Sequence, residues 1–261
     1  MKVKKSKVLI ILIITTIVLI NPNSFYCNAY YVKNKIIINS QEAEIKNKLY
    51  NSKKVAYITI DDGPSNITID DGPSKYTDDI LEILDKHKVK GTFFLIDRNM
   101  NIYPDKVKKI VESGNVVGLH SVSHDIHKLY KTSISAKEEF DINNQTFYKI
   151  TGKYSNLVRL PYGSKPYACK ETYNNLVSAG YKVWDWNIDT EDWKSSSSEI
   201  VENTITYSKN KNEIIVLIHE KKQTVEALDS LISYLIKEGY DIIPINEDQN
   251  PKNFWLKNLY K

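Results

Sequence analysis

Two copies of one nine-residue stretch follow each other directly: Ile58-Thr-Ile-Asp61-Asp62-Gly-Pro-Ser-Asn66 and Ile67-Thr-Ile-Asp70-Asp71-Gly-Pro-Ser-Lys75. In each copy a β-branched run predicts the end of a strand, and the Gly-Pro pair predicts the turn that stops it. The two adjacent carboxylates repel each other, so a metal ion, or a division of roles between a ligand and a base, would stabilise them. A solvated turn is the alternative interpretation, because Asp, Gly and Pro are ordinary turn residues.

From Lys54 onward, strand and helix patterns alternate. The predicted strands are Val55–Ile60, Thr92–Ile96, Val116–Leu119, Leu157–Leu160, Lys182–Ile188, Ile214–Ile218 and Asp241–Ile245. Thr77 is predicted to cap the first helix and Pro104 to open the second. Four more helices are predicted at Ile134–Tyr148, Lys170–Ala179, Ser198–Lys209 and Thr224–Glu238. Seven strands alternating with six helices predict parallel βα units, and therefore a barrel or an open doubly wound sheet.

The first 29 residues have the pattern of an export signal. Four lysines precede Val8–Ile20, an apolar run of thirteen residues broken only by two threonines. This run is shorter than the roughly 20 residues of a membrane span but has the length of a signal-peptide core. Small residues at Cys27 and Ala29 predict cleavage after Ala29, with an uncleaved membrane anchor as the alternative. We therefore expect a secreted or cell-wall-associated protein.

Removal of this segment leaves a chain without a net charge. The whole sequence has 36 Lys and Arg against 32 Asp and Glu, and the first 29 residues hold four lysines and no acid. No basic patch remains to indicate a nucleic-acid partner. Cys169 is the one cysteine beyond the signal, which excludes a disulfide framework and a cysteine metal cluster. About 230 remaining residues fit one α/β domain.

The unusual polar residues of the chain follow the predicted strands. Beyond the Asp pairs, they are His120 and His124, Arg159, Asp189 and Asp192, and His219. Parallel α/β folds place their active sites at the carboxyl ends of the strands, and scattered surface residues would not sort in this way. The sequence therefore predicts one site at that end of the sheet.

Two of these groups have a specific chemical reading. Two imidazoles four residues apart, with one carboxylate, suit a catalytic zinc or a similar divalent ion, although many such histidine pairs merely share a helix face. Arg159 lies inside an apolar strand, where its charge needs a partner, and Asp189 or Asp192 is the predicted one. Trp193 follows the acidic cluster and is predicted at the rim of the site.

Taken together, the motifs resemble those of the polysaccharide deacetylases of carbohydrate esterase family 4. In chain order they are Thr59-Ile-Asp-Asp-Gly-Pro64 (or its repeat), His120-Ser-Val-Ser-His124, Arg159-Leu-Pro-Tyr-Gly163, Asp189-Thr-Glu-Asp-Trp193 and Leu217-Ile-His219. The resemblance covers about residues 54–245 and implies a distorted (β/α)7 barrel, in agreement with the seven predicted strands. The chain then divides into a signal (1–29), a lead-in (30–53), the catalytic domain (54–245) and a tail (246–261) expected on the outside.

The resemblance implies that Asp61 is the general base, with Asp70 of the second copy as the alternative. Asp62, or alternatively Asp71, would bind the metal together with His120 and His124. Zinc is the expected ion, and the same ligands also accept Co, Ni or Mn.

The remaining motifs resemble the parts of the family site that handle the substrate. Arg159 would orient the base, and His219 would be the general acid, held by Asp189 or Asp192. The backbone N–H of Tyr162 would stabilise the oxyanion. The pocket for the acetyl methyl group would be lined by Pro161, Trp193 and Leu217.

These roles imply a deacetylase that releases acetate from the N-acetyl groups of a GlcNAc- or MurNAc-containing polymer. Peptidoglycan is the favoured substrate, from a likeness to bacterial peptidoglycan deacetylases, and chitin-like oligomers are also expected. One alternative is O-deacetylation of acetylated xylan. Another is a catalytically inactive sugar-binding domain, because the duplication adds nine residues beside the metal site. A membrane contact is expected only if the signal is an uncleaved anchor.

Spacing and packing favour different copies of the repeat. The second copy runs through Ser74 into the first helix, as the family motif does. Only Asp61, however, ends a full strand, since the residues before Asp70 include Pro64 and Asn66, which do not suit a central strand. Nine extra loop residues cost only on the order of 1 kcal/mol in closure entropy. The sequence therefore favours Asp61 as the base and Asp62 as the ligand.

Overall fold

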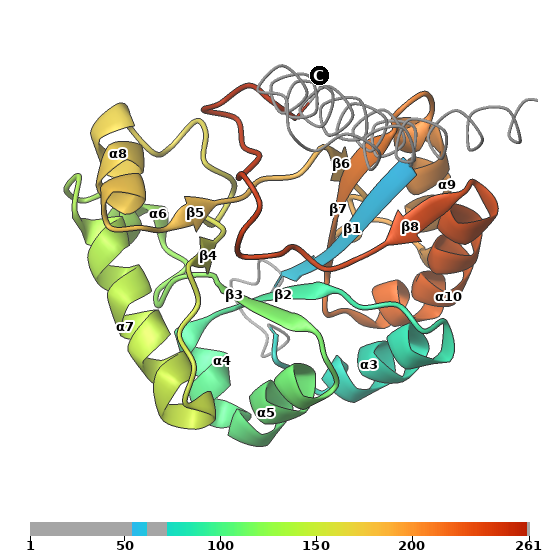
Figure 1. Ribbon diagram of the computed structural model, residues 1–261, viewed down its shortest axis with the longest axis horizontal. Helices are drawn as coiled ribbons and strands as arrows, with labels where there is room; N and C mark the ends of the chain where they lie inside the picture. The colour runs from blue at the N-terminus through green and yellow to red at the C-terminus, as the bar shows by residue number, and fades with distance from the viewer. Residues whose placement is uncertain (1–53, 62–71, 260–261) are drawn as a thin grey trace, which may run out of the picture. The chain divides into compact units, whose positions relative to one another are not determined.

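The computed structural model describes residues 54–61 and 72–259, so the predicted signal and lead-in segments lie outside the described residues. The strands are β1 (Lys54–Asp61), β2 (Thr92–Leu95), β3 (Val116–Leu119), β4 (Leu157–Val158), β5 (Lys182–Val183), β6 (Ile188–Asp189), β7 (Glu213–His219) and β8 (Tyr240–Ile242). The helices are α3 (Thr77–Lys86), α4 (Asp97–Ile102), α5 (Pro104–Glu112), α6 (Ile126–Leu129), α7 (Ser135–Thr151), α8 (Lys170–Ser178), α9 (Ser197–Ser208) and α10 (Lys222–Lys237). Figure 1 shows the helices arranged around the strands. None of the helices within these ranges is long and apolar enough to span a membrane.

All strand pairs in the described ranges are parallel, which confirms the predicted βα units. The strands follow the order β5-β4-β3-β2-β1-β7-β6, and β8 pairs with β1. One side of β1 pairs along its length with β7, while its other side pairs with β8 near Lys54 and with β2 near Asp61. The run from Val55 to Ile60 is thus the central strand that the sequence predicts.

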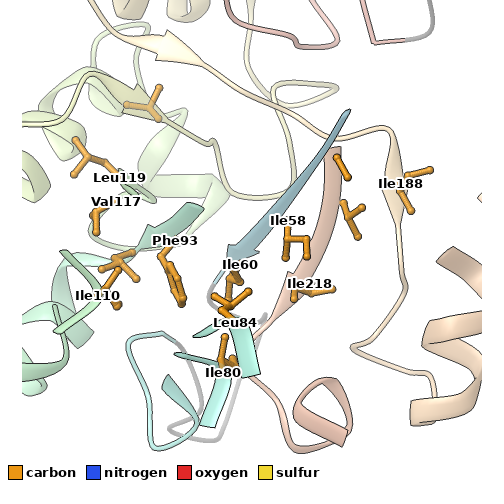
Figure 2. Close-up of a cluster of buried hydrophobic side chains, with 14 of the residues drawn as sticks. Ile58, Ile60, Ile80, Leu84, Phe93, Ile110, Val117, Leu119, Ile188 and Ile218 are labelled. Atoms are coloured by element: carbon orange, nitrogen blue, oxygen red, sulfur yellow. The ribbon is translucent and has the colours of Figure 1, made fainter. Parts of the chain in front are cut away.

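The side chains of β1 alternate between two apolar clusters, as the two-residue period of a strand requires. Ala56, Ile58 and Ile60 face the cluster that packs against the helices, and Figure 2 shows Ile60 beside Leu84 of α3. Val55 and Tyr57 belong to the other cluster, which lies on the inner face of the curved sheet. The same alternation places Thr59 and Asp61, which are two and four residues after Tyr57, on the inner face.

The predicted strand Lys182–Ile188 is wrong as a single element, because it forms the two short strands β5 and β6. The backbone N–H of Trp184 still donates to Val158 of β4 at 2.9 Å, whereas that of Asn187 donates to Ile215 of β7 at 3.2 Å. This segment therefore crosses from one edge of the sheet to the other. In the described ranges the two edge strands β5 and β6 are thus joined by the chain between them, and not by a strand-to-strand pairing.

Two further expectations need correction. Thr77 is the first residue of α3 and not its cap, since Tyr76 occupies the cap position. The tail is not confined to the outside, because Asn253 is fully buried and Leu259 belongs to the inner cluster. The amide of Asn253 donates to the carbonyl of Val183 at 2.9 Å, which ties the tail to β5.

Candidate active site

Those predicted site residues that the structure describes gather at the carboxyl ends of the strands. Arg159 alternates with Val158 and Leu160, which face the helices, and Leu217 and His219 alternate with Ile218 in the same way. Asp61 and His219 are register partners at the ends of the neighbouring strands β1 and β7. Because partners in a sheet lie about 4.8 Å apart, these two side chains stand next to each other.

Arg159 and Asp61 form a buried ion pair. Arg159 Nη1 lies 2.7 Å from Asp61 Oδ1 and 2.8 Å from Thr59 Oγ1. Its Nε and Nη2 donate to the carbonyls of Trp184 and Asp185 at 3.2 and 3.3 Å, and its guanidinium carbon lies 4.2 Å from the centre of the Phe94 ring. Arg159 is completely buried. The site thus holds a cation whose donors are directed at the carboxylate and at backbone oxygens.

The predicted partner of Arg159, Asp189 or Asp192, is therefore wrong. Arg159 directly follows β4 and Asp61 ends β1, and the curvature of the sheet brings the two side chains together. Burial raises the pKa of Asp61, and the charge of Arg159 is the largest opposing effect; the pKa remains above its ordinary value.

Replacement of Arg159 by methionine is expected to lower the free energy of unfolding by about 3–5 kcal/mol at pH 7, because a buried charge then loses its partner. Denaturant titration measures this loss. The matched control is Lys54→Met, which removes an exposed pair with Glu238 at 3.7 Å and should change stability by about 0–1 kcal/mol. Equal effects of the two variants would contradict a special role for the buried pair.

His120 and His124 are placed as neutral imidazoles. His120 is buried, and its Nδ1 lies 2.8 Å from the carbonyl oxygen of Arg159, which can only accept. Nδ1 therefore carries the proton, and Nε2, 4.0 Å from Asp61 Oδ2, keeps its lone pair. The ring of His124 has its centre 5.1 Å from that of His120. Burial lowers the pKa of both histidines to about 3.

This state of the two histidines suits a metal. A histidine ligand must be neutral, and it commonly donates its second ring N–H to a backbone carbonyl. Among the described residues, no group of three or more His, Cys, Asp and Glu side chains could hold a metal ion. The predicted third ligand, Asp62 or Asp71, and the alternative base Asp70 lie outside the described residues. The part of the site that is described fits two of the three expected ligands.

His219 is held by Asp192. Its Nδ1 lies 2.6 Å from Asp192 Oδ1, and its backbone N–H donates to Asp192 Oδ2 at 2.6 Å. Thr224 Oγ1 also donates to Asp192 Oδ2, at 2.6 Å. Asp189, the other acid left open by the sequence, instead accepts from the backbone N–H of Glu191 at 2.9 Å. Of the two acids, Asp192 is thus the one that orients His219.

The protonation of His219 is favoured by its neighbours. Burial lowers the pKa of this imidazole, but the ion pair with Asp192 and the charge of Asp61 outweigh burial, and the pKa lies above its ordinary value. The site therefore combines two neutral imidazoles with a third whose charged form is favoured by its neighbours.

The loops around these groups contain unusual backbone conformations. Ser121, His124, Tyr162 and Glu191 follow strands β3, β4 and β6 with φ values of 80°, 50°, 64° and 54°. Such left-handed conformations are strained for residues other than glycine, and they persist only where the surrounding contacts impose them. The contacts of these loops are therefore part of the construction of the site.

The predicted pocket residues lie around the same end of the sheet. Leu217 and Pro161 are buried, whereas Trp193 is 52% exposed, which suits its predicted place at the rim. Tyr162 is 46% exposed, and the centre of its ring lies 4.9 Å from that of His124. These two exposed aromatic rings are available to a ligand that approaches from solvent.

Three acids without a predicted role also contact the site loops: Glu139, Asp185 and Glu220. Glu220 had one usable signal, since it follows His219 directly at the end of a buried strand. The other two had none, because their partners are distant in the sequence.

The comparisons with known proteins agree with the motifs. A family model described as polysaccharide deacetylase matches residues 48–184. The chain belongs to the polysaccharide deacetylase family. One relative, a peptidoglycan-N-acetylglucosamine deacetylase of Bacillus cereus, is 35% identical over 214 residues, which cover 79% of this chain and 75% of that protein. The peptidoglycan-N-acetylmuramic acid deacetylase PdaA of Bacillus subtilis is 31% identical over 81% of this chain and 78% of its own length.

Solved structures of the polysaccharide deacetylase family share the fold. The polysaccharide deacetylase Bc1974 from Bacillus cereus has a TM-score of 0.71 and 36% identity, over 79% of this chain and 100% of that one. A pseudoenzyme of carbohydrate esterase family 4 from Bacillus anthracis has a TM-score of 0.65 and 28% identity, over 77% of this chain and 67% of that one. The predicted α/β fold of the polysaccharide deacetylase type is therefore confirmed.

Proposed function

We propose that this chain is an exported, metal-dependent deacetylase that hydrolyses the N-acetyl groups of peptidoglycan and releases acetate. The observation that carries the proposal is the register pairing of Asp61 with His219. It places a carboxylate held by Arg159 next to an imidazole held by Asp192, which is the arrangement that a base and an acid on one reacting group require. The names of the peptidoglycan deacetylases among its relatives support the substrate class.

In this proposal each side chain has one task. Asp61 accepts a proton from the attacking water through the oxygen that Arg159 leaves free, Oδ2. The backbone N–H of Tyr162 donates to the oxyanion that forms when the water oxygen adds to the acetyl carbon. His219 then donates its proton to the amine nitrogen as the C–N bond breaks, since an unprotonated amine leaves poorly.

The proposed metal site consists of His120, His124 and one aspartate of the repeat. A divalent ion there would supply Lewis-acid activation of water and of the acetyl carbonyl. Zinc suits two imidazoles and a carboxylate, and Co, Ni or Mn can take the same ligands.

The assay for this proposal is acetate release by purified residues 30–261 with added metal. Peptidoglycan, chitin oligomers and acetylated xylan are compared as substrates. We expect release from peptidoglycan and a smaller release from chitin oligomers. Release from xylan alone would support the O-deacetylase alternative, and no release from any of the three would support an inactive sugar-binding domain.

The choice between the two copies of the repeat is tested by metal content. We expect Asp62→Ala to lose the bound metal and Asp71→Ala to keep it, as measured by elemental analysis of the purified proteins. Loss of metal only in Asp71→Ala would assign the ligand to the second copy.

Deletion of residues 63–71 tests whether the duplication inactivates the chain. This deletion leaves one complete copy, Thr59-Ile-Asp-Asp-Gly-Pro-Ser, whichever copy is regarded as removed. We expect the deletion variant and the parent protein to release acetate at similar rates. Activity that appears only in the deletion variant would identify the natural chain as a pseudoenzyme.

Export is a separate part of the proposal and rests on residues 1–29. It is tested by N-terminal sequencing of the protein recovered outside the cell. A sequence that begins at Tyr30 is expected, and a full-length, membrane-bound product would support the uncleaved anchor instead.

A further inference from the structure

Three serines in the loops at the carboxyl ends of the strands make the same pair of hydrogen bonds. In each case the backbone N–H and the side-chain hydroxyl of one serine donate to the carboxyl group of a distant acid. The three pairs, called serine clamps below, are Ser74 with Glu220, Ser123 with Glu139, and Ser164 with Asp185. None of the six residues has a task in the proposed reaction.

The first serine clamp holds the loop of the paired histidines. Ser123 N and Oγ lie 2.8 and 2.6 Å from Glu139 Oε2 and Oε1, and Val122 N adds a third bond at 3.0 Å. Ser123 precedes His124, whose φ is 50°. The carboxyl group of Glu139, from α7, thus restrains the backbone directly before His124, the residue in the left-handed conformation.

The second serine clamp holds the loop of Tyr162. Ser164 N and Oγ lie 2.8 and 2.5 Å from Asp185 Oδ1 and Oδ2, and Phe254 N also donates to Oδ2 at 2.8 Å. Ser164 and Asp185 are both fully buried. This serine is two residues after Tyr162, whose φ is 64°, so the clamp restrains the peptide that would meet the oxyanion.

The third serine clamp holds the turn of the second repeat copy. Ser74 N and Oγ lie 3.0 and 2.7 Å from Glu220 Oε2, which Thr77 Oγ1 also approaches to 2.7 Å. Gly72 packs so closely here that a Cβ atom would lie 2.7 Å from Glu220 Oε1. Glu220 is fully buried and follows His219 directly. The turn of the second copy is therefore bound to the end of β7, whereas Asp61 of the first copy ends β1.

We propose that Glu139, Asp185 and Glu220 are positioning residues, each of which holds one loop of the active site in its working conformation. The two copies of the repeat are then used for different parts of the site. The first copy supplies the strand and Asp61, and the second supplies the turn that leads into α3. The expected changes in kcat and zinc affinity rest on the proposed function. The hydrogen bonds of the three clamps rest on the geometry alone.

The clamp on the histidine loop is tested with Ser123→Ala, which leaves the backbone and Glu139 in place. Loss of an outer contact of a metal ligand typically costs about 10- to 100-fold in affinity. We therefore expect zinc binding, measured by titration of the metal-free protein, to weaken by about 10-fold, with kcat at saturating zinc little changed. Unchanged zinc affinity would contradict this clamp.

Loss of the clamp on the Tyr162 loop should change kcat and leave zinc affinity unchanged, the reverse of the result expected for Ser123→Ala. Ser164→Ala is expected to lower kcat by about 10-fold while zinc affinity stays as in the parent protein. A fall in zinc affinity with unchanged kcat would contradict the assignment.

The clamp on the repeat is tested by comparing Ser74→Ala with Ser65→Ala, the equivalent serine of the first copy. We expect Ser74→Ala and Glu220→Ala to lower zinc affinity or kcat by about 10-fold, Glu220→Gln to retain most of both, and Ser65→Ala to change neither. The reverse order of the two serine variants would assign the turn to the first copy.

Ser155→Ala is the control for a purely structural serine. Ser155 is buried just before β4, where its N–H donates to Asn144 Oδ1 at 3.0 Å and its hydroxyl to the carbonyl of Val117 at 2.8 Å. It should lower Tm without changing zinc affinity or kcat. If the three clamp variants behave like Ser155→Ala, the positioning role is wrong even though the parent enzyme is active. If the parent protein neither releases acetate nor binds zinc, the proposed function itself is wrong.

Discussion

Replacement of His219 by alanine is expected to lower kcat for acetate release by about 10²- to 10⁴-fold, the usual contribution of a general acid. Bound metal should be retained, because His219 ends β7 and pairs with Asp192 at 2.6 Å. Elemental analysis and steady-state kinetics on one protein preparation measure both quantities. Loss of the metal together with kcat would reassign His219 as a ligand.

The pH dependence of kcat is an independent test of His219 as the general acid. A general acid works only while it is protonated, so kcat should fall as pH rises through the pKa of His219. The charges of Asp192 and Asp61 raise this pKa against the effects of burial and of Lys221. Asp192→Asn removes the larger of the two raising charges. The high-pH fall of kcat should therefore begin at a lower pH in this variant than in the parent protein.

His87→Ala is the matched control for His219→Ala. His87 also pairs with an aspartate, since its Nε2 lies 2.7 Å from Asp229 Oδ1, but it caps the end of α3 away from the inner face. Its replacement should leave kcat and the pH profile unchanged. A pH profile of His219→Ala identical to that of the parent protein would show that another group is the acid.

Replacement of His120 by alanine is expected to remove both bound metal and acetate release. His120 Nδ1 donates to the carbonyl of Arg159, which leaves Nε2 as the electron-pair donor, and the pKa of about 3 keeps the ring neutral at pH 7. A histidine binds a metal ion only when its imidazole is neutral. Metal content and turnover are measured on the same samples.

His127→Ala serves as the control for His120→Ala, because His127 is exposed and lies in the following short helix α6. It should retain metal and activity. Full metal content and turnover in His120→Ala would refute the proposed ligand set. Loss of activity with metal retained would instead give His120 a role in the reaction alone.

Much of the fold could be predicted because its signals are local. The run from Val55 to Ile60 is β-branched and apolar, and Pro104 and Gly114 mark the two ends of α5. The two-residue period of each strand also decides which side chains face inward, and this places Asp61, Arg159 and His219 on one face. The order of strands and helices then brings those residues to one end of a parallel sheet.

Other features could not be predicted because they depend on which distant segments meet. The resemblance implies that Arg159 orients Asp61, but from the residue pattern alone Arg159 could pair with any acid at the same end of the sheet, and the curvature between β4 and β1 selects Asp61. The split of Lys182–Ile188 into β5 and β6 depends on the two sheet edges between which that segment crosses. The burial of Leu259 depends on the inner cluster that its side chain fills.

The sequence by itself determined the βα alternation, the inward-facing positions and the motifs that make the chain a member of its family, because these follow from short-range periods and spacings. Only the tertiary structure decided that Asp192 and not Asp189 holds His219, and that three distant acids hold three loops through their serines. It also decided that Asp61 of the first repeat and the turn of the second are placed beside β7. These contacts join residues at least 16 positions apart, and the chain must be folded before their geometry exists.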